Sequence, residues 1–148
     1  MEEEPFEFLT YKNLYDIEHI KDTEGMIDLI LYHQRNYVTV MVINPSCKLI
    51  QDEFDQIGDI YFTVGHSGQK RKLPSGRSKK GGTYTKKDTV ICTVSMKDGR
   101  KFKIRSHVEA KLLQVNEDLC QNMESLKKVP QDGFIAIFLI NKKYSPDN

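Results

Sequence analysis

The 148-residue sequence contains no tryptophan and only three cysteines, and it lacks a long apolar run. Cys47, Cys92 and Cys120 are odd in number and widely spaced, which favours a reducing intracellular compartment over a disulfide framework. Cys92 alternates with apolar residues and is expected to be buried, whereas Cys47 follows a turn and is expected to be exposed. No stretch reaches the roughly 18–20 apolar residues of a membrane helix. The acidic N-terminus has no hydrophobic segment, which argues against a secretory signal, so we expect one soluble domain.

Residue patterns typical of catalytic or metal sites are also missing. The four histidines have no cysteine or acid at ligand spacing, and no nucleophile–base pair follows from spacing. These histidines are His19, His33, His66 and His107. The stretch that begins at Gly65 lacks the Gly-Lys-Ser/Thr ending of a phosphate loop. Glu53 and Asp55 fall in a turn-like stretch and are interpreted as solvated. We therefore expect no catalytic residues, no metal and no cofactor.

The net charge of +1 hides a division along the chain. Residues 1–60 carry thirteen acidic and four basic side chains, a balance of −9, whereas residues 61–109 carry thirteen basic and three acidic ones, a balance of +10. Residues 110–148 carry five of each. Either the two regions face each other or one basic face is available to an anionic partner, and the sequence leaves both possibilities open.

The first half of the chain has the composition of β-strands. Two apolar, β-branched runs at 26–32 and 37–43 predict a hairpin, which ends at Pro45 because proline donates no ladder hydrogen bond. Residues 57–64 predict a third strand. Before these runs, residues 11–19 predict a short helix.

A basic segment occupies residues 65–87, where the composition changes to Gly, Ser, Lys and Arg. Such a segment cannot bury enough apolar surface to fold and is predicted to be a long loop. We predict that six of its cations contact a partner, as an import signal, a phosphate-binding strip or a clamp on an acidic protein surface. They are Lys70, Arg71, Lys72, Arg77, Lys79 and Lys80. A solvated loop is the alternative. Base-specific reading is not supported, because only Tyr84 is near and stacking modules use several aromatics.

A second hairpin is predicted around the turn at residues 97–99. A three-residue loop sets Val94 opposite Phe102 and Cys92 opposite Ile104, and this register keeps each face uniform, whereas a two-residue turn mixes charged and apolar side chains. The glycine of the loop then occupies the left-handed position of such a turn. The outward face of the second strand carries three further residues predicted to bind a partner, Lys101, Lys103 and Arg105.

Residues 107–128 are compatible with two structures. The spacing of Val108, Leu112, Val115 and Leu119 is that of a helical stripe. The alternative is a strand through Val115, followed by a short helix over 117–126 that Asn116 caps. A last strand over 134–140 follows Gly133.

Several of these segments resemble known proteins. Val115-Asn116-Glu117 and Gly133-Phe134-Ile135-Ala136 resemble the closing half of the glycine-cleavage H-protein, and this resemblance requires the strand through Val115. Together with Ser75-Gly76-Arg77-Ser78-Lys79-Lys80-Gly81, Val90-Ile91-Cys92 and Asp98-Gly99, their order is similar to that of the Abitram family, also called Simiate. The match covers roughly residues 55–141.

The resemblance implies a mainly β fold with short helices, an H-protein-like barrel-sandwich hybrid without the lipoyl lysine. The sandwich is expected over 26–141, after an N-terminal segment at 1–25 and before a frayed tail at 142–148. Gly99 stands where the modified lysine of a carrier belongs. Lys97 and Lys101 beside it are poor substitutes, so a lipoyl or acyl carrier is the less favoured alternative.

The resemblance also implies a function. Members of the Abitram family are described as actin-binding transcription modulators, which predicts a non-enzymatic protein of the nucleus, including its speckles, and of the cytoplasm. Actin is the expected partner, and nucleic acid or another acidic protein surface is the alternative. We expect no membrane association, and we expect the protein to be a monomer. The function of the first fifty residues remains open.

Overall fold

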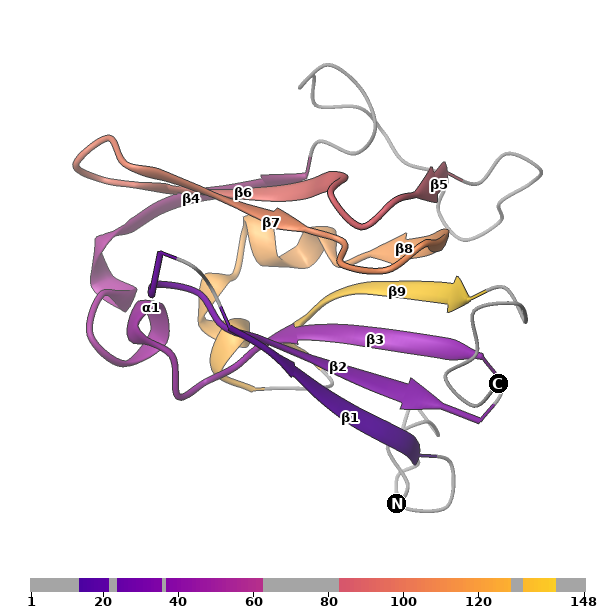
Figure 1. Ribbon diagram of the computed structural model, residues 1–148. Helices are drawn as coiled ribbons and strands as arrows, with labels where there is room; N and C mark the ends of the chain where they lie inside the picture. Colours follow the sequence, from indigo (N-terminus) through magenta and orange to yellow (C-terminus); the bar gives the residue numbers. More distant parts are fainter. Residues whose placement is uncertain (1–13, 22–23, 36, 63–82, 129–131, 141–148) are drawn as a thin grey trace.

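The computed structural model describes residues 14–21, 24–35, 37–62, 83–128 and 132–140. These residues form two antiparallel sheets, one with the strand order β1-β2-β3-β9-β8-β5 and one with the order β4-β6-β7. In Figure 1, β4, β6 and β7 lie above β1, β2, β3 and β9. The mainly β fold class is therefore confirmed.

The large sheet begins with three sequential antiparallel strands. Its strands are β1 (Leu14–Ile20), β2 (Leu29–Gln34), β3 (Val38–Ile43), β5 (Thr83–Thr85), β8 (Ala110–Val115) and β9 (Phe134–Ile140). The predicted hairpin is confirmed as β2 and β3, with Leu31 opposite Met41, and β3 ends before Pro45 as expected. The helix predicted over 11–19 is wrong for residues 14–19, which the structure describes. These residues belong to β1, whose backbone pairs with β2 in an antiparallel ladder.

The small sheet contains β4 (Ile57–Phe62), β6 (Val90–Met96) and β7 (Lys101–Arg105). The predicted register is confirmed, since Val94 pairs with Phe102 and Cys92 pairs with Ile104. Gly99 has a φ of 100°, the left-handed conformation that the three-residue loop requires.

Residues 110–115 form β8 rather than part of a helix, so the helical stripe is the wrong interpretation and the strand is confirmed. β8 pairs with β9 on one side and with β5 on the other, and these ladders override the local helical spacing. β5 itself corrects the predicted loop, whose residues 83–85 form a short strand. The loop residues 65–82 lie outside the described part of the chain.

The helix predicted over 117–126 is replaced by two 3-10 helices, η5 (Glu117–Cys120) and η6 (Met123–Lys127). Asn116 does not cap η5 with its side chain. Its Nδ2 instead donates hydrogen bonds to the backbone oxygens of Asp132 and Phe134, each at 3.0 Å. The asparagine therefore joins the end of β8 to the start of β9, and its side chain is not available to cap a helix at Glu117.

Two short helices, α1 (Lys48–Gln51) and η3 (Phe54–Gln56), connect β3 to β4. Cys47 precedes α1 and is buried at 4% exposure, which corrects the exposed position expected for it. The turn faces inward because Leu49 follows it into the core and the Leu49 N–H donates to the Met26 oxygen at 3.0 Å.

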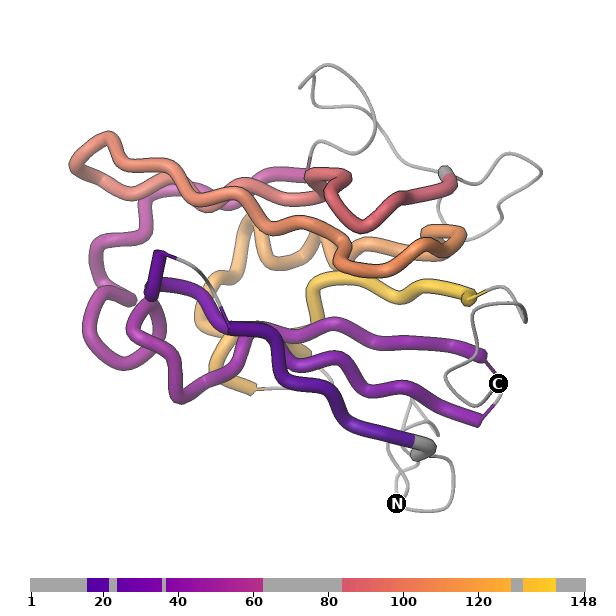
Figure 2. The backbone as a smooth tube through the Cα atoms, in the orientation of Figure 1, coloured from indigo at the N-terminus to yellow at the C-terminus, as the bar shows by residue number. Residues whose placement is uncertain are grey.

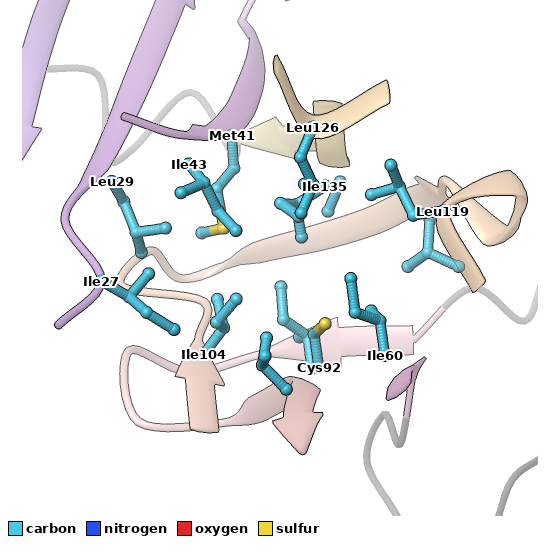
Figure 3. Close-up of a cluster of buried hydrophobic side chains, with 14 of the residues drawn as sticks. Ile27, Leu29, Met41, Ile43, Ile60, Cys92, Ile104, Leu119, Leu126 and Ile135 are labelled. Carbon is cyan, nitrogen blue, oxygen red and sulfur yellow. The ribbon is translucent and has the colours of Figure 1, made fainter. Parts of the chain in front are cut away.

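The core lies between the two sheets. Figure 3 shows Leu29, Met41 and Ile43 of the large sheet directed toward Cys92 and Ile104 of the small one. Each such aliphatic side chain contributes roughly 1.5–3 kcal/mol when fully buried. Figure 2 shows β3 beside β9, although nearly a hundred residues separate them in the sequence.

The large sheet is apolar on its other face as well. Val40 and Val42 belong to a second buried cluster, separate from the cluster that contains Met41 and Ile43. Both faces of β3 are therefore buried, which explains why the run at 38–43 is almost continuously apolar instead of alternating.

Candidate interaction surface

The three cations predicted on β7 lie on one face of this strand. Lys101, Lys103 and Arg105 are exposed, whereas Phe102 between them is half-buried and Ile104 is buried. The alternation follows from the strand geometry, in which successive side chains point to opposite faces. The structure thus brings together three of the nine predicted partner-binding residues. The other six, Lys70, Arg71, Lys72, Arg77, Lys79 and Lys80, lie outside the described residues.

β7 is an edge strand, because the small sheet ends with it. The Met96 N–H donates to the Arg100 oxygen at 2.8 Å, and this bond fixes the phase of the β6–β7 ladder. Bonded and non-bonded pairs alternate in an antiparallel ladder, so Phe102 and Ile104 exchange bonds with β6. The backbone N–H and C=O groups of Lys101 and Lys103 consequently point away from β6, toward the open side of the sheet.

A groove of about 520 Å³ runs along this open side. One wall consists of the five consecutive residues 101–105. Because consecutive residues of a strand point to opposite faces, their joint presence means that the backbone edge lines the groove. The opposite wall contains Ile20, Ile27 and Leu29, with Lys21 and Glu24 beside them. The groove is therefore apolar on one side and bordered by cations.

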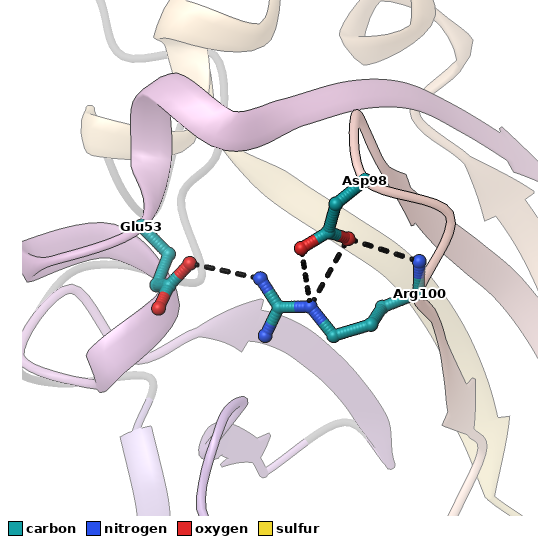
Figure 4. Close-up of polar contacts among 3 residues, drawn as sticks. All are labelled: Glu53, Asp98 and Arg100. Atoms are coloured by element: carbon teal, nitrogen blue, oxygen red, sulfur yellow. Dashed lines mark hydrogen bonds and ion pairs between the residues drawn. The ribbon is translucent and has the colours of Figure 1, made fainter.

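The tip of the β6–β7 hairpin is tied to the segment before β4. Figure 4 shows Arg100 between two carboxylates, with its Nε at 2.9 Å from Asp98 Oδ2 and its Nη2 at 3.1 Å from Glu53 Oε1. The Lys97 N–H also donates to the Gln56 oxygen at 2.7 Å. Glu53 is thus paired and partly buried, which corrects its expected solvation, whereas Asp55 is exposed as expected.

These contacts perturb the charged groups of the tip. The backbone N–H of Arg100, and then its guanidinium, hold the pKa of Asp98 below its usual value. The hydrogen bond to Glu53, followed by that to Asp98, raises the pKa of Arg100. Both shifts favour the charged forms of Asp98 and Arg100, and the ion pairs of Arg100 fix the tip against the turn.

The hairpin tip does not have the form of a carrier site. Its apex is Asp98-Gly99, and the neighbouring Lys97 is exposed beside a turn that ion pairs hold in place. Lys101 belongs to β7, one residue beyond Arg100. Gly99, the residue that the resemblance aligns with a carrier lysine, therefore lies in the turn of the hairpin.

Of the four histidines, His33 has a structural role. His33 is buried, and its Nδ1 lies 2.8 Å from Thr39 Oγ1 while its Nε2 lies 3.0 Å from Glu18 Oε1, so it is a packing residue as expected. Within the described ranges, no three residues of His, Cys, Asp or Glu gather as metal ligands. None of the helices in those ranges combines the length and apolar character needed to cross a membrane.

Sequence reasoning missed the second wall of the groove and the Glu53–Arg100 pair. Glu53 and Arg100 are 47 residues apart, and Ile20 is still farther from β7 in the chain. No local pattern reports such distances. The one available signal was the alternation of charge on β7, which identified the exposed face but not the edge.

Comparison with known proteins finds several relatives. The chain is 39% identical to Protein Abitram of Xenopus tropicalis over 111 residues, which cover 74% of this chain and 60% of that protein. It is 32% identical to Protein Abitram of Gallus gallus over 113 residues, covering 76% and 65%. It is 27% identical to Protein Abitram of Dictyostelium discoideum over 129 residues, covering 86% and 70%. No protein-family model matches the chain. The chain thus spans less than two thirds of the frog and chicken relatives.

Proposed function

This chain belongs to the Abitram family, and on that premise we propose that it is a non-enzymatic interaction protein that binds actin and modulates transcription. The family name stands for these two activities. The observation that carries the proposal is the row of exposed cations on β7. Such a row is suited to an acidic protein surface, and the surface of actin is acidic.

The spacing of the cations supports a contact with a protein. Lys101, Lys103 and Arg105 are two residues apart, so they repeat at about 7 Å along an extended strand. Arg105 is held by a hydrogen bond from its Nη1 to the Asp88 oxygen at 2.9 Å. A row of like charges raises the association rate with an oppositely charged partner and orients it.

We further propose that the two sheets form an H-protein-like barrel-sandwich hybrid that has lost its carrier function. The domain extends over 26–141, and β1 of the preceding segment is joined to it through its pairing with β2. The proposed domain leaves out the tail at 142–148, which is outside the described residues. The absence of a lysine at the apex of the hairpin supports the loss of the carrier role.

The proposed compartments are the nucleus, with its speckles, and the cytoplasm. The clusters at 70–72 and 77–80 have the composition of a nuclear import signal. We propose that the protein acts as a monomer and without a cofactor.

Cosedimentation with actin filaments tests the contact. A variant with Lys101, Lys103 and Arg105 changed to Ser loses about 0.5 kcal/mol per exposed charge, so we expect binding to weaken about tenfold. A control variant changes three lysines elsewhere in the described chain to Ser and removes the same charge. These are Lys48, Lys111 and Lys128. Equal binding by the two variants would reject β7 as the contact.

A second variant separates the loop from the strand. Changing Lys70, Arg71, Lys72, Arg77, Lys79 and Lys80 to Ser keeps β7 intact. Weaker cosedimentation of this variant assigns part of the contact to the loop. Unchanged binding excludes the loop from the actin contact, and nuclear import of a fluorescent fusion then decides whether the loop acts as an import signal.

The alternative function is nucleic-acid binding, which the same cations favour. If the three β7 cations each neutralised one phosphate, the logarithm of the affinity would fall with the logarithm of salt with a slope of about −2.7 on duplex DNA. An electrophoretic shift with duplex DNA or RNA probes measures this slope. Filament binding that an excess of nucleic acid leaves unchanged favours actin. The carrier alternative requires a discrete added mass on one lysine, which an intact-mass measurement of protein from cells would reveal.

A further inference from the structure

The open edge of β7 is a site for pairing with another chain. Its outward N–H and C=O groups, at Lys101 and Lys103, have no strand beside them among the described elements. Extended peptides bind readily to such edges, and proteins often protect them with charged side chains. Lys101 and Lys103 on an edge strand would serve that protection by themselves.

The groove distinguishes this edge from one that is merely protected. A protected edge faces open water, whereas this edge faces a wall that contains Ile20, Ile27 and Leu29. The volume of about 520 Å³ lies within the range of roughly 300–1,000 Å³ that is typical of binding clefts. A chain that enters the groove therefore meets hydrogen-bonding groups on one side and apolar side chains on the other.

We propose that β7 binds an extended segment of a partner protein by strand addition, and that this segment alternates acidic and apolar residues. In an added strand the side chains alternate between the same two faces as those of β7. One set lies beside Lys101, Lys103 and Arg105, where cross-strand pairs of opposite charge are favourable. The other set lies on the side of Ile104, facing the apolar wall.

The charge of the groove selects an acidic partner. Among the described residues that line it are the cations Lys21, Lys101, Lys103 and Arg105 and one acid, Glu24. Lys21 already pairs with Asp28, at 3.8 Å, so the positive charge comes mainly from the three cations of β7. A second copy of this chain is a poor occupant, because pairing β7 with β7 would place lysines and arginines opposite one another. A nucleic acid offers neither a row of backbone amides nor alternating apolar side chains.

This inference rests on the proposed function in one respect, because both use the surface of β7. It adds the form of the partner segment, which is an extended strand. The probe is a fluorescein-labelled peptide of about eight residues that alternates Glu and Val, a length within the usual range of strands. Its binding to the full chain is measured by fluorescence anisotropy. Two further peptides carry backbone N-methyl groups on all the Glu residues or on all the Val residues.

Strand addition predicts opposite results for the two methylated peptides. Alternate N–H groups of an added strand point to β7 and the others point away. Methylation of the facing set removes two hydrogen bonds, to the outward carbonyls of Lys101 and Lys103, of about 1 kcal/mol each, so we expect about a thirtyfold loss of affinity. Methylation of the other set leaves the affinity within about threefold. Equal affinities of the two methylated peptides would overturn the proposal, and this comparison needs no variant protein.

Two substitutions of the protein give a second test. Lys103→Pro removes both the charge and the outward N–H, whereas Lys103→Ala removes only the charge. Proline is tolerated on edge strands where its nitrogen faces away from the ladder. We expect the proline variant to bind the peptide about fivefold to tenfold more weakly than the alanine variant, which corresponds to one hydrogen bond. Equal binding by two variants with the same thermal unfolding would reject pairing at this edge.

The actin measurement separates the two proposals. One outcome is that the two methylated peptides differ in affinity while changing Lys101, Lys103 and Arg105 to Ser leaves filament binding unchanged. In that case strand addition stands and the actin contact on β7 fails. If filament binding depends on these cations but both methylated peptides bind alike, the actin contact stands and strand addition fails. A second copy of this chain is the competing occupant of the edge, and sedimentation velocity without peptide tests for it. A dimer that Lys103→Pro abolishes would overturn the proposal.

Discussion

Asn116 provides the sharpest test of how the fold is held together. It is 7% exposed, and its side-chain amide donates to the oxygens of Asp132 and Phe134 at 3.0 Å. These two bonds join the ends of β8 and β9 across the turn formed by η5 and η6. Each bond contributes about 1 kcal/mol, and its loss leaves a carbonyl without its donor. We therefore expect Asn116→Ala to lower the free energy of unfolding by about 2–3 kcal/mol.

Asn116→Asp should destabilise the protein more than alanine does. The aspartate has nearly the same shape but replaces the amide donors with oxygens that face two carbonyl oxygens. Both burial and these oxygens disfavour the ionised form, so the folded state should raise the pKa of the new carboxyl. At pH 7 we expect a loss of at least about 4 kcal/mol, because a buried charge would then lack its partners.

The pH dependence of the aspartate variant checks the cause. When the folded pKa is above the unfolded value, the folded state binds more protons, and its relative stability falls as pH rises between the two values. The variant should therefore recover part of its stability, relative to the unmodified protein, when the pH is lowered from 7 toward about 4, the pKa of an unfolded aspartate. The protonated acid can donate one of the two hydrogen bonds.

Urea unfolding followed by circular dichroism measures these differences. Asn122→Ala is the matched control, because Asn122 precedes η6 without a capping bond from its side chain and is exposed. The control should remain within about 0.5 kcal/mol of the unmodified protein. If Asn116→Ala were equally mild, or if the aspartate variant showed no recovery at low pH, the two bonds would not support the turn as described.

Four further predictions concern single residues. Gly99→Ala should cost about 1 kcal/mol in urea unfolding, purely through its φ of 100°, because an added Cβ meets nothing within 4 Å. Burial raises the pKa of the Cys92 thiol, which makes this thiol unreactive. Iodoacetamide should therefore label the partly exposed Cys120 and leave Cys92 unlabelled until the protein unfolds. Early labelling of Cys92 would contradict its burial. Gln34 is buried, and neither polar atom of its side chain has a hydrogen-bond partner among the described residues. Gln34→Met should therefore raise the free energy of unfolding by about 1 kcal/mol, and a clear loss would refute this. The folded pKa of Asp98 is lowered, so its stabilisation is present above the unfolded pKa and is lost as pH falls through the folded value. The stability difference between the unmodified protein and Asp98→Asn should therefore disappear in acid, and a difference that persists at pH 2 would argue against the ion pair.

The second hairpin shows what local patterns predict well. Alternation along 90–105 and the position of Gly99 determine the register, because a one-residue slip would invert every side chain. The same alternation places Lys101, Lys103 and Arg105 on the exposed face. Period-two burial and turn chemistry are properties of neighbouring residues, so the sequence displays them directly.

The errors occur where distant contacts decide the structure. The segment at 14–20 is a strand because the edge of β2 is available to it, and Cys47 is buried because Leu49 follows it into the core. Asn116 has the residue type of a helix cap, yet its amide bonds two carbonyls beyond the following turn. In each case the deciding partner lies outside the window in which propensity operates.

The sequence by itself determines the β class, the register of the β6–β7 hairpin, the Asp98-Gly99 turn at its tip and the basic row on β7, because each depends on the order and spacing of nearby residues. Only the tertiary structure decides that β7 is an edge, that Ile20 and Ile27 face it across a groove, and that Glu53 fixes the hairpin tip through Arg100. The physical reason is that an edge or a groove exists only after remote segments have packed. The sequence specifies which residue types form each wall of the groove, but it does not show that the two walls face each other.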